Sequence, residues 1–283
     1  MKKRTILVAM AVALVLTGCK GKPADETETN PTQATTAPTV PTEPTVPEMK
    51  TVYIHASITQ EYGATVSRTE YIFDEKDWVK EVIVYTNDVE TKRHSVECDE
   101  NGNFTRWTSD GSVMEYRYDN WGHSLGMSMY IGQQLVSTTT YTWENDLRTS
   151  VTTTMAGQSQ TQQVLMTYDS DGKLLRQDSY NADTLLNYSI YAYNSDGRTA
   201  SMNSYQPDGN LHSVGKYDWD GNTLTITTTD PNGNVTQTAV LTYDDAGNLL
   251  THTVFNAAGE QLSKETHTWK AVQVDPDCPR ASV

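Results

Sequence analysis

An aromatic residue returns at nearly regular intervals through most of this 283-residue chain. It is mostly followed by Asp, Asn or Glu, and the intervals run from 20 to 26 residues. A second, mostly aromatic column lies about twelve residues further on in most units. Such a period indicates tandem structural repeats, and eight units are predicted between residues 71 and 268. The first column, in which cysteine once replaces the aromatic residue, consists of Phe73, Cys98, Tyr118, Trp143, Tyr168, Tyr193, Tyr217, Tyr243 and Trp269.

Each unit has the sequence pattern of two β-strands joined by a turn. Alternating runs rich in Thr, Tyr, Val and Leu end in turns such as residues 169–172, where a final glycine supplies the positive φ of a tight turn. Eight units give sixteen strands, and residues 52–59 and 64–72 are candidates for two more. We therefore expect an all-β fold over residues 51–270, an antiparallel meander or solenoid of about eight two-strand repeats, followed by a tail at 271–283.

A flat sheet of so many strands is disfavoured, because strands twist relative to one another. The sheet should twist into a superhelix, curl into an open shell, or close partly into a barrel. An open sheet would leave ends near Val52 and Trp269, which would be capped or would pair with another chain.

The run YDWDGNTLTITTTDPNGNVTQTAVLTYDDAGNLLTHTVFNAAGEQL, residues 217–262, resembles tandem YD repeats of the Rhs type. The resemblance extends over about 200 residues and is clearest from Tyr168 onward. Large Rhs proteins wind such repeats into a hollow spiral shell that encloses a toxin. The resemblance implies a related strand pattern here, and it does not imply the toxin function.

The N-terminal segment has the features of an export signal. A basic start precedes an apolar run at residues 6–17, which is too short to span a bilayer comfortably. The sequence Leu-Thr-Gly-Cys that ends at Cys19 resembles the lipobox of bacterial lipoproteins. We expect residues 1–18 to be a signal peptide and Cys19 to carry the lipid, with the mature chain anchored in the cell membrane and facing outside the cytoplasm, at the cell surface or in the periplasm. The alternative is an ordinary signal peptide with a coincidental cysteine.

Residues 19–50 hold six of the ten prolines and few large apolar side chains, so they are predicted to be a disordered, extended tether. The formal net charge is −15, and it becomes −18 once the leader with its three basic residues is removed. This charge argues against nucleic acid as a partner. Beyond Cys19 only Cys98 and Cys278 remain. Two separate thiols are the preferred interpretation, and one long-range bridge is the alternative.

Residues 122–126, Gly-His-Ser-Leu-Gly, fit the nucleophile elbow of α/β-hydrolases. That elbow needs a strand, a strained turn and a helix. The repeat register instead makes Gly122 a hairpin-turn glycine and Ser124 the start of a strand. A hairpin is therefore favoured over catalysis, and no catalytic residue is predicted.

Repeated turns with two acidic or amide side chains, such as residues 99–102 and 230–233, offer oxygen ligands for calcium. Asp and Asn also favour such turns through local hydrogen bonds, which is the preferred interpretation, and weak calcium binding is the alternative. The six histidines are scattered along the sequence without the spacing that metal ligands usually show. They are His55, His94, His123, His212, His252 and His267. Neither a metal site nor a cofactor is predicted.

Two tryptophans, Trp121 and Trp219, are predicted to lie in turns, where an indole has little sheet to cover. Aromatic rings presented from hairpins can hold sugar rings or peptides. For these two tryptophans the preferred interpretation is that the rings fold back over the neighbouring turn, and ligand contact is the alternative. The sequence thus favours a non-enzymatic binding module for a glycan, a cell-wall polymer or a surface protein. The alternative is a structural envelope lipoprotein without a specific ligand, and a hydrolase is a remote third.

Overall fold

The computed structural model describes residues 49–158 and 161–274. These residues form eighteen β-strands in chain order, and the described part of the chain contains no helix. No segment of it meets the length and apolarity that a membrane-crossing helix needs. The strands are β1 (Lys50–Tyr62), β2 (Thr65–Phe73), β3 (Val79–Thr86), β4 (Val89–Cys98), β5 (Phe104–Ser109), β6 (Ser112–Tyr118), β7 (Ser124–Ile131), β8 (Gln134–Glu144), β9 (Leu147–Met155), β10 (Thr161–Tyr168), β11 (Leu174–Asn181), β12 (Thr184–Tyr193), β13 (Thr199–Tyr205), β14 (Leu211–Asp220), β15 (Thr223–Thr229), β16 (Val235–Tyr243), β17 (Leu249–Asn256) and β18 (Gln261–Val274).

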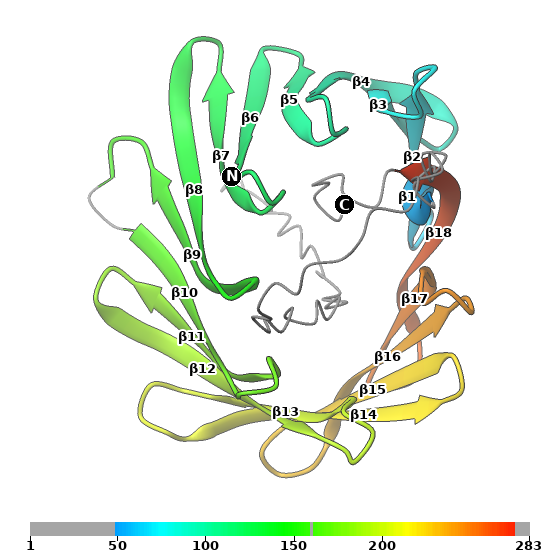
Figure 1. Ribbon diagram of the computed structural model, residues 1–283. Coiled ribbons are helices and arrows are strands. Elements are labelled where there is room, and N and C mark those ends of the chain that lie inside the picture. The colour runs from blue at the N-terminus through cyan, green and yellow to red at the C-terminus, as the bar shows by residue number, and fades with distance from the viewer. Residues whose placement is uncertain (1–48, 159–160, 275–283) are drawn as a thin grey trace, which may run out of the picture. The chain divides into compact units, whose positions relative to one another are not determined.

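The sheet closes on itself. Each strand pairs antiparallel with the next one in the chain, and β1 also pairs with β18. Figure 1 shows the strands as a ring in which β1 and β18 lie side by side. The predicted open solenoid or meander of eight repeats is therefore wrong, although the all-β class and both candidate strands are confirmed. The expected open ends are paired, Val52 with Val272 and Trp269 with His55.

Closure has a simple physical reason. Register shifts beside the turns add bulges, and bulges increase the local twist and bend of a sheet. A strongly curled sheet of eighteen strands brings its two edges together. Pairing those edges satisfies backbone groups that would otherwise be exposed to other chains. We call the junction of β1 and β18 the seam, and we call the end of the barrel where β1 begins and β18 ends the entry end.

The repeated aromatic column anchors neighbouring hairpins. Tyr168 Oη donates a hydrogen bond to the backbone oxygen of Arg148 at 2.8 Å, and Tyr193 Oη donates to Leu174 O at 2.8 Å. The indole of Trp269 donates in the same way to Leu249 O at 2.7 Å. The column therefore favours rings with a polar tip, because the ring packs on the sheet while its tip holds the start of a strand some twenty residues earlier.

The acidic residue after the column closes the turn. Asp169 Oδ1 accepts hydrogen bonds from the amides of Asp171 at 2.9 Å and Lys173 at 2.8 Å. Asp244 and Asp230 cap their own turns with the same pair of bonds. These carboxylates serve the local backbone, as the preferred interpretation of the turns requires.

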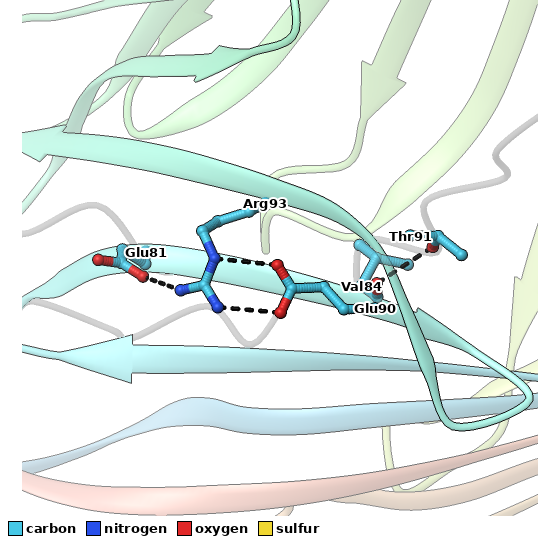
Figure 2. A network of polar contacts seen from close by, with 5 residues as sticks. All are labelled: Glu81, Val84, Glu90, Thr91 and Arg93. Carbon is cyan, nitrogen blue, oxygen red and sulfur yellow. Dashed lines mark hydrogen bonds and ion pairs between the residues drawn. The ribbon is translucent and has the colours of Figure 1, made fainter.

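The apolar core is divided into small clusters within the sheet. One contains Val79, Val82 and Val96, and another contains Leu224, Ala239 and Leu241. Polar ladders accompany them, and Figure 2 shows one between β3 and β4. Arg93 makes a bidentate contact with Glu90 at 3.0 Å for each bond and also pairs with Glu81. The pair of Arg93 with Glu81 joins β4 to β3, and cross-strand pairs of this kind help to fix the strand register.

The strands run from Lys50 to Val274, slightly beyond the predicted repeat region at 51–270, so residues 271–274 of the predicted tail belong to β18. The signal peptide, Cys19, nearly all of the tether and Cys278 lie outside the described residues. Lipid attachment therefore stays a prediction, and so does the preference for two separate thiols at Cys98 and Cys278 over a bridge between them.

Candidate functional site

Trp121 lies in the turn between β6 and β7 at the entry end, as predicted. The residue is 76% exposed, the largest exposed fraction among the large apolar residues of the described chain. Exposing an indole forgoes the free energy that its burial would provide. Tryptophan is enriched at binding interfaces, so such a ring on a hairpin tip is a candidate contact for a ligand.

The turn that carries Trp121 is held rigidly by Asp119. Its Oδ1 accepts hydrogen bonds from the amides of Trp121 and His123, both at 2.9 Å, and its Oδ2 lies 2.9 Å from His123 Nδ1. Burial acts to raise the pKa of Asp119, but the hydrogen bonds from His123 and Trp121 outweigh it, so the net pKa is lowered. The carboxylate is therefore charged at neutral pH and keeps the turn in one conformation.

His123 joins this turn to the next one at the same end. Its Nε2 lies 3.1 Å from Asp146 Oδ1, in the turn between β8 and β9. Its ring stacks on Trp143 with centroids 4.8 Å apart and planes 20° apart. Trp143 Nε1 in turn donates to Ser124 O at 2.7 Å. Trp121 thus sits on a supported base, which reduces the conformational entropy that a ligand would have to remove on binding.

A polar groove of about 550 Å³ adjoins the Trp121 turn. The two turns that flank it join β4 to β5 and β6 to β7. Its lining supplies carboxylates, side-chain amides, a hydroxyl and two phenols, and contains no basic side chain. The lining residues are Asp99, Glu100, Asn101, Asn103, Thr105, Tyr116, Tyr118, Asp119 and Asn120.

The two tyrosines form a neutral wall of this groove. Burial raises the pKa of Tyr116 and, with Tyr116 as a further cause, that of Tyr118. Both phenols are protonated in the physiological range, so they can donate or accept hydrogen bonds. Phenols, amides and carboxylates next to a turn that carries an exposed tryptophan suit a ligand rich in hydroxyl groups.

Trp219 occupies a different environment from the predicted one. It lies within β14, which continues to Asp220, so its placement in a turn was wrong. The hairpin turns at Gly221 and Asn222, later than the repeat register suggested. The indole stacks on Tyr243 at 5.8 Å, lies beneath the guanidinium of Arg198 at 4.7 Å, and packs on the Leu224 cluster. Trp219 covers the core and does not join Trp121 in one site.

The hairpin interpretation of residues 122–126 is confirmed. Gly122 has a φ of 86° in the turn, and Ser124 begins β7 opposite Tyr118. Both ring nitrogens of the adjacent His123 face aspartates, Asp119 and Asp146. The local structure is therefore a β-hairpin and differs from the strand, turn and helix of a nucleophile elbow.

Sequence reasoning missed a cluster at the seam. His55, His252, His267 and Glu265 come together there from β1, β17 and β18, although His55 and His267 are 212 residues apart. Only knowledge of the closure and its register could have revealed this grouping. Within the described residues, no three histidine, cysteine or acidic side chains converge as metal ligands do.

Comparison with known proteins gives one family model and a set of distant structural matches. A family model described as "Uncharacterised protein" matches residues 114–251, and no curated protein matches the chain. Among solved structures, a chain of the Tc holotoxin pore of Photorhabdus luminescens is 12% identical with a TM-score of 0.38, over 69% of this chain and 14% of the toxin chain. A porin-like protein from Bacteroides vulgatus is 10% identical with a TM-score of 0.34, over 76% of this chain and 98% of that one. Another from Bacteroides uniformis is 12% identical with a TM-score of 0.31, over 76% and 96%. The likeness lies in a β-rich fold, and at these sequence identities the activities of those proteins cannot be inferred for this chain.

Proposed function

We propose that this protein is a lipid-anchored, non-enzymatic binding module of the Rhs-type YD-repeat kind that holds a saccharide of the cell envelope in the groove beside Trp121. The observation that carries the proposal is the 76% exposed Trp121 on a turn that Asp119 and His123 hold in place. The indole would lie against the apolar face of a sugar ring. The groove's carboxylates and amides would accept and donate hydrogen bonds to its hydroxyl groups.

The proposed location follows from the lipobox-like sequence that ends at Cys19 and the proline-rich segment after it. Lipid on Cys19 would tether the barrel outside the cytoplasm, where envelope polysaccharides are accessible. Two acyl chains or more are needed for stable anchoring. Mass spectrometry of the mature N-terminus tests the lipid, and an unmodified Cys19 would remove the tether from the proposal.

Removal of the exposed indole should weaken saccharide binding at least tenfold. Loss of an aromatic platform costs about 0.5 to 1.5 kcal/mol beyond its area, and the buried apolar area adds to this. Tryptophan fluorescence titrations of residues 50–283 with chitohexaose, cellohexaose and solubilised peptidoglycan would measure the effect for wild type and Trp121→Ala.

Val89→Ala is the matched control, because Val89 is 65% exposed but begins β4 at the opposite end of the barrel. It should bind like wild type, and Trp121→Tyr should retain part of the affinity. Equal affinity of Trp121→Ala and wild type would exclude the groove as the binding site. Absence of saturable binding by the wild type to every preparation would favour the structural envelope role instead.

A further inference from the structure

The seam holds a chain of polar side chains that connects the first strand to the last two. His55 Nε2 on β1 lies 3.3 Å from His267 Nδ1 on β18. Across the His267 ring, Nε2 lies 3.7 Å from Glu265 Oε2, and the same carboxylate oxygen lies 3.8 Å from His252 Nδ1 on β17. Gln60 of β1 donates to Glu265 Oε1 at 2.8 Å. We call these five residues the seam cluster.

The contact between the two imidazoles requires that at least one of the two rings be neutral. A hydrogen bond between His55 Nε2 and His267 Nδ1 needs one donor and one acceptor. Protonation of both rings would place two N–H groups and two positive charges against each other. His55 is also covered by Trp269, with ring centroids 3.8 Å apart, and by Tyr71 at 6.1 Å. Burial first, and then His267, lowers the pKa of His55 to about 4.

The neighbouring charges do not relieve this constraint. Glu265 faces His267 on the side of the ring away from His55, and its pKa is strongly lowered by His252, then His267, with Gln60 contributing. Lys270, the next charged residue on β18, pairs with Asp77 of the turn between β2 and β3. Tyr71 of β2 has a pKa that burial raises, so it stays neutral.

The first part of β1 depends on the seam alone. Residues 50–55 pair with β18, whereas pairing of β1 with β2 begins at Ser57 opposite Glu70. A weakened seam would therefore release these residues without opening any hairpin of the ring. The released edges of β1 and β18 would then be available for pairing with another strand.

We propose that the seam cluster is an acid-sensitive clasp, in which protonation of His55 separates the start of β1 from β18 before the other hairpins unfold. The closed seam binds fewer protons than the open one between pH 4 and pH 6.5, so it loses stability as the pH falls through that window. The opening equilibrium should rise on the order of tenfold between pH 7 and pH 5.

Hydrogen exchange with mass spectrometry tests the clasp on the full barrel. Protection factors, corrected for the intrinsic pH dependence of exchange, are compared for residues 50–55 and for β15, which lies in the ring away from the seam. Protection of residues 50–55 should fall about tenfold from pH 7 to pH 5, while β15 stays protected.

His55→Gln provides the matched variant, because its side chain can still hydrogen-bond but cannot take up a proton. Its seam protection should be the same at both pH values. Equal loss of protection in β15 and residues 50–55 of the wild type would show global unfolding and overturn the clasp. Constant protection of residues 50–55 in the wild type down to pH 5 would overturn the clasp as well. Because this test uses the wild type alone, it remains decisive even where the His55→Gln variant fails to fold.

Discussion

Gly126→Ala is expected to destabilise the protein by about 3 kcal/mol or more, since it combines strain with a backbone clash. Gly126 lies within β7 at a φ of 139°, a backbone conformation that residues other than glycine rarely adopt. A Cβ there would lie 2.1 Å from the carbonyl oxygen of Thr139 on the neighbouring strand β8. Because both residues belong to paired strands, neither backbone can move without disturbing the pairing. Urea unfolding followed by circular dichroism measures the loss.

Gly132→Ala is the control, because it places a side chain at a positive φ without a steric clash. Gly132 has a φ of 60° in the turn between β7 and β8, and a Cβ there would meet no atom within 4 Å. Its cost should be about 1 to 2 kcal/mol, the usual cost of a left-handed conformation. Equal stability of the two variants would contradict the close approach of β7 and β8 at Gly126.

Arg176→Met should cost about 2 to 4 kcal/mol, because it leaves a buried carboxylate without its partner. Arg176 Nε lies 2.9 Å from both oxygens of Asp178, and its Nη2 lies 2.6 Å from Oδ1. The Asp178 side chain is only 13% exposed. The guanidinium also lies 4.1 Å above the ring of Tyr188, which stacks on Tyr205. Thermal unfolding of the variant at pH 7 measures the effect.

The double variant Arg176→Met/Asp178→Leu separates the buried charge from the lost packing. Replacing both partners of a buried ion pair with apolar residues is often neutral. The double variant should therefore regain most of the stability that the single variant loses. A double variant as unstable as Arg176→Met alone would show that the contact with Tyr188, rather than the charge of Asp178, accounts for the loss.

The strand pattern could be predicted because it rests on local rules. The aromatic column and the Asp and Gly residues of the turns recur in each unit, and each kind of residue acts on nearby backbone. Tyr168 anchors the start of a strand, and Asp169 caps a turn. The turn position of Trp121 followed from the same register, whereas its exposure did not. Trp219 did not follow it, because the turn after β14 uses Gly221 and Asn222 and the strand continues past the expected turn.

Closure and the seam cluster could not be predicted from the sequence. Whether a curled sheet of many strands closes depends on twist and bulges summed over all its strands, and no single segment encodes that sum. The meeting of His55 with His267 depends entirely on closure. The groove beside the Trp121 turn was missed for a related reason, since its lining comes from two turns and the strands next to them, and their spacing is set by the sheet.

Cross-linking across the seam tests the closed barrel most directly. Thr51 and Gln273 are Cα partners, and their side chains lie 2.8 Å apart. In an open sheet, β1 and β18 would be separated by the width of the intervening strands, roughly 80 Å at about 4.8 Å per strand. In dilute solution, where links form within single molecules, a short bismaleimide should therefore join the two cysteines of the Thr51→Cys/Gln273→Cys variant. The control variant Thr51→Cys/Lys173→Cys, with Lys173 on the turn between β10 and β11, should give no link. A link between positions 51 and 273 seen by mass spectrometry is the predicted result, and its absence in a folded double variant would contradict closure of the ring.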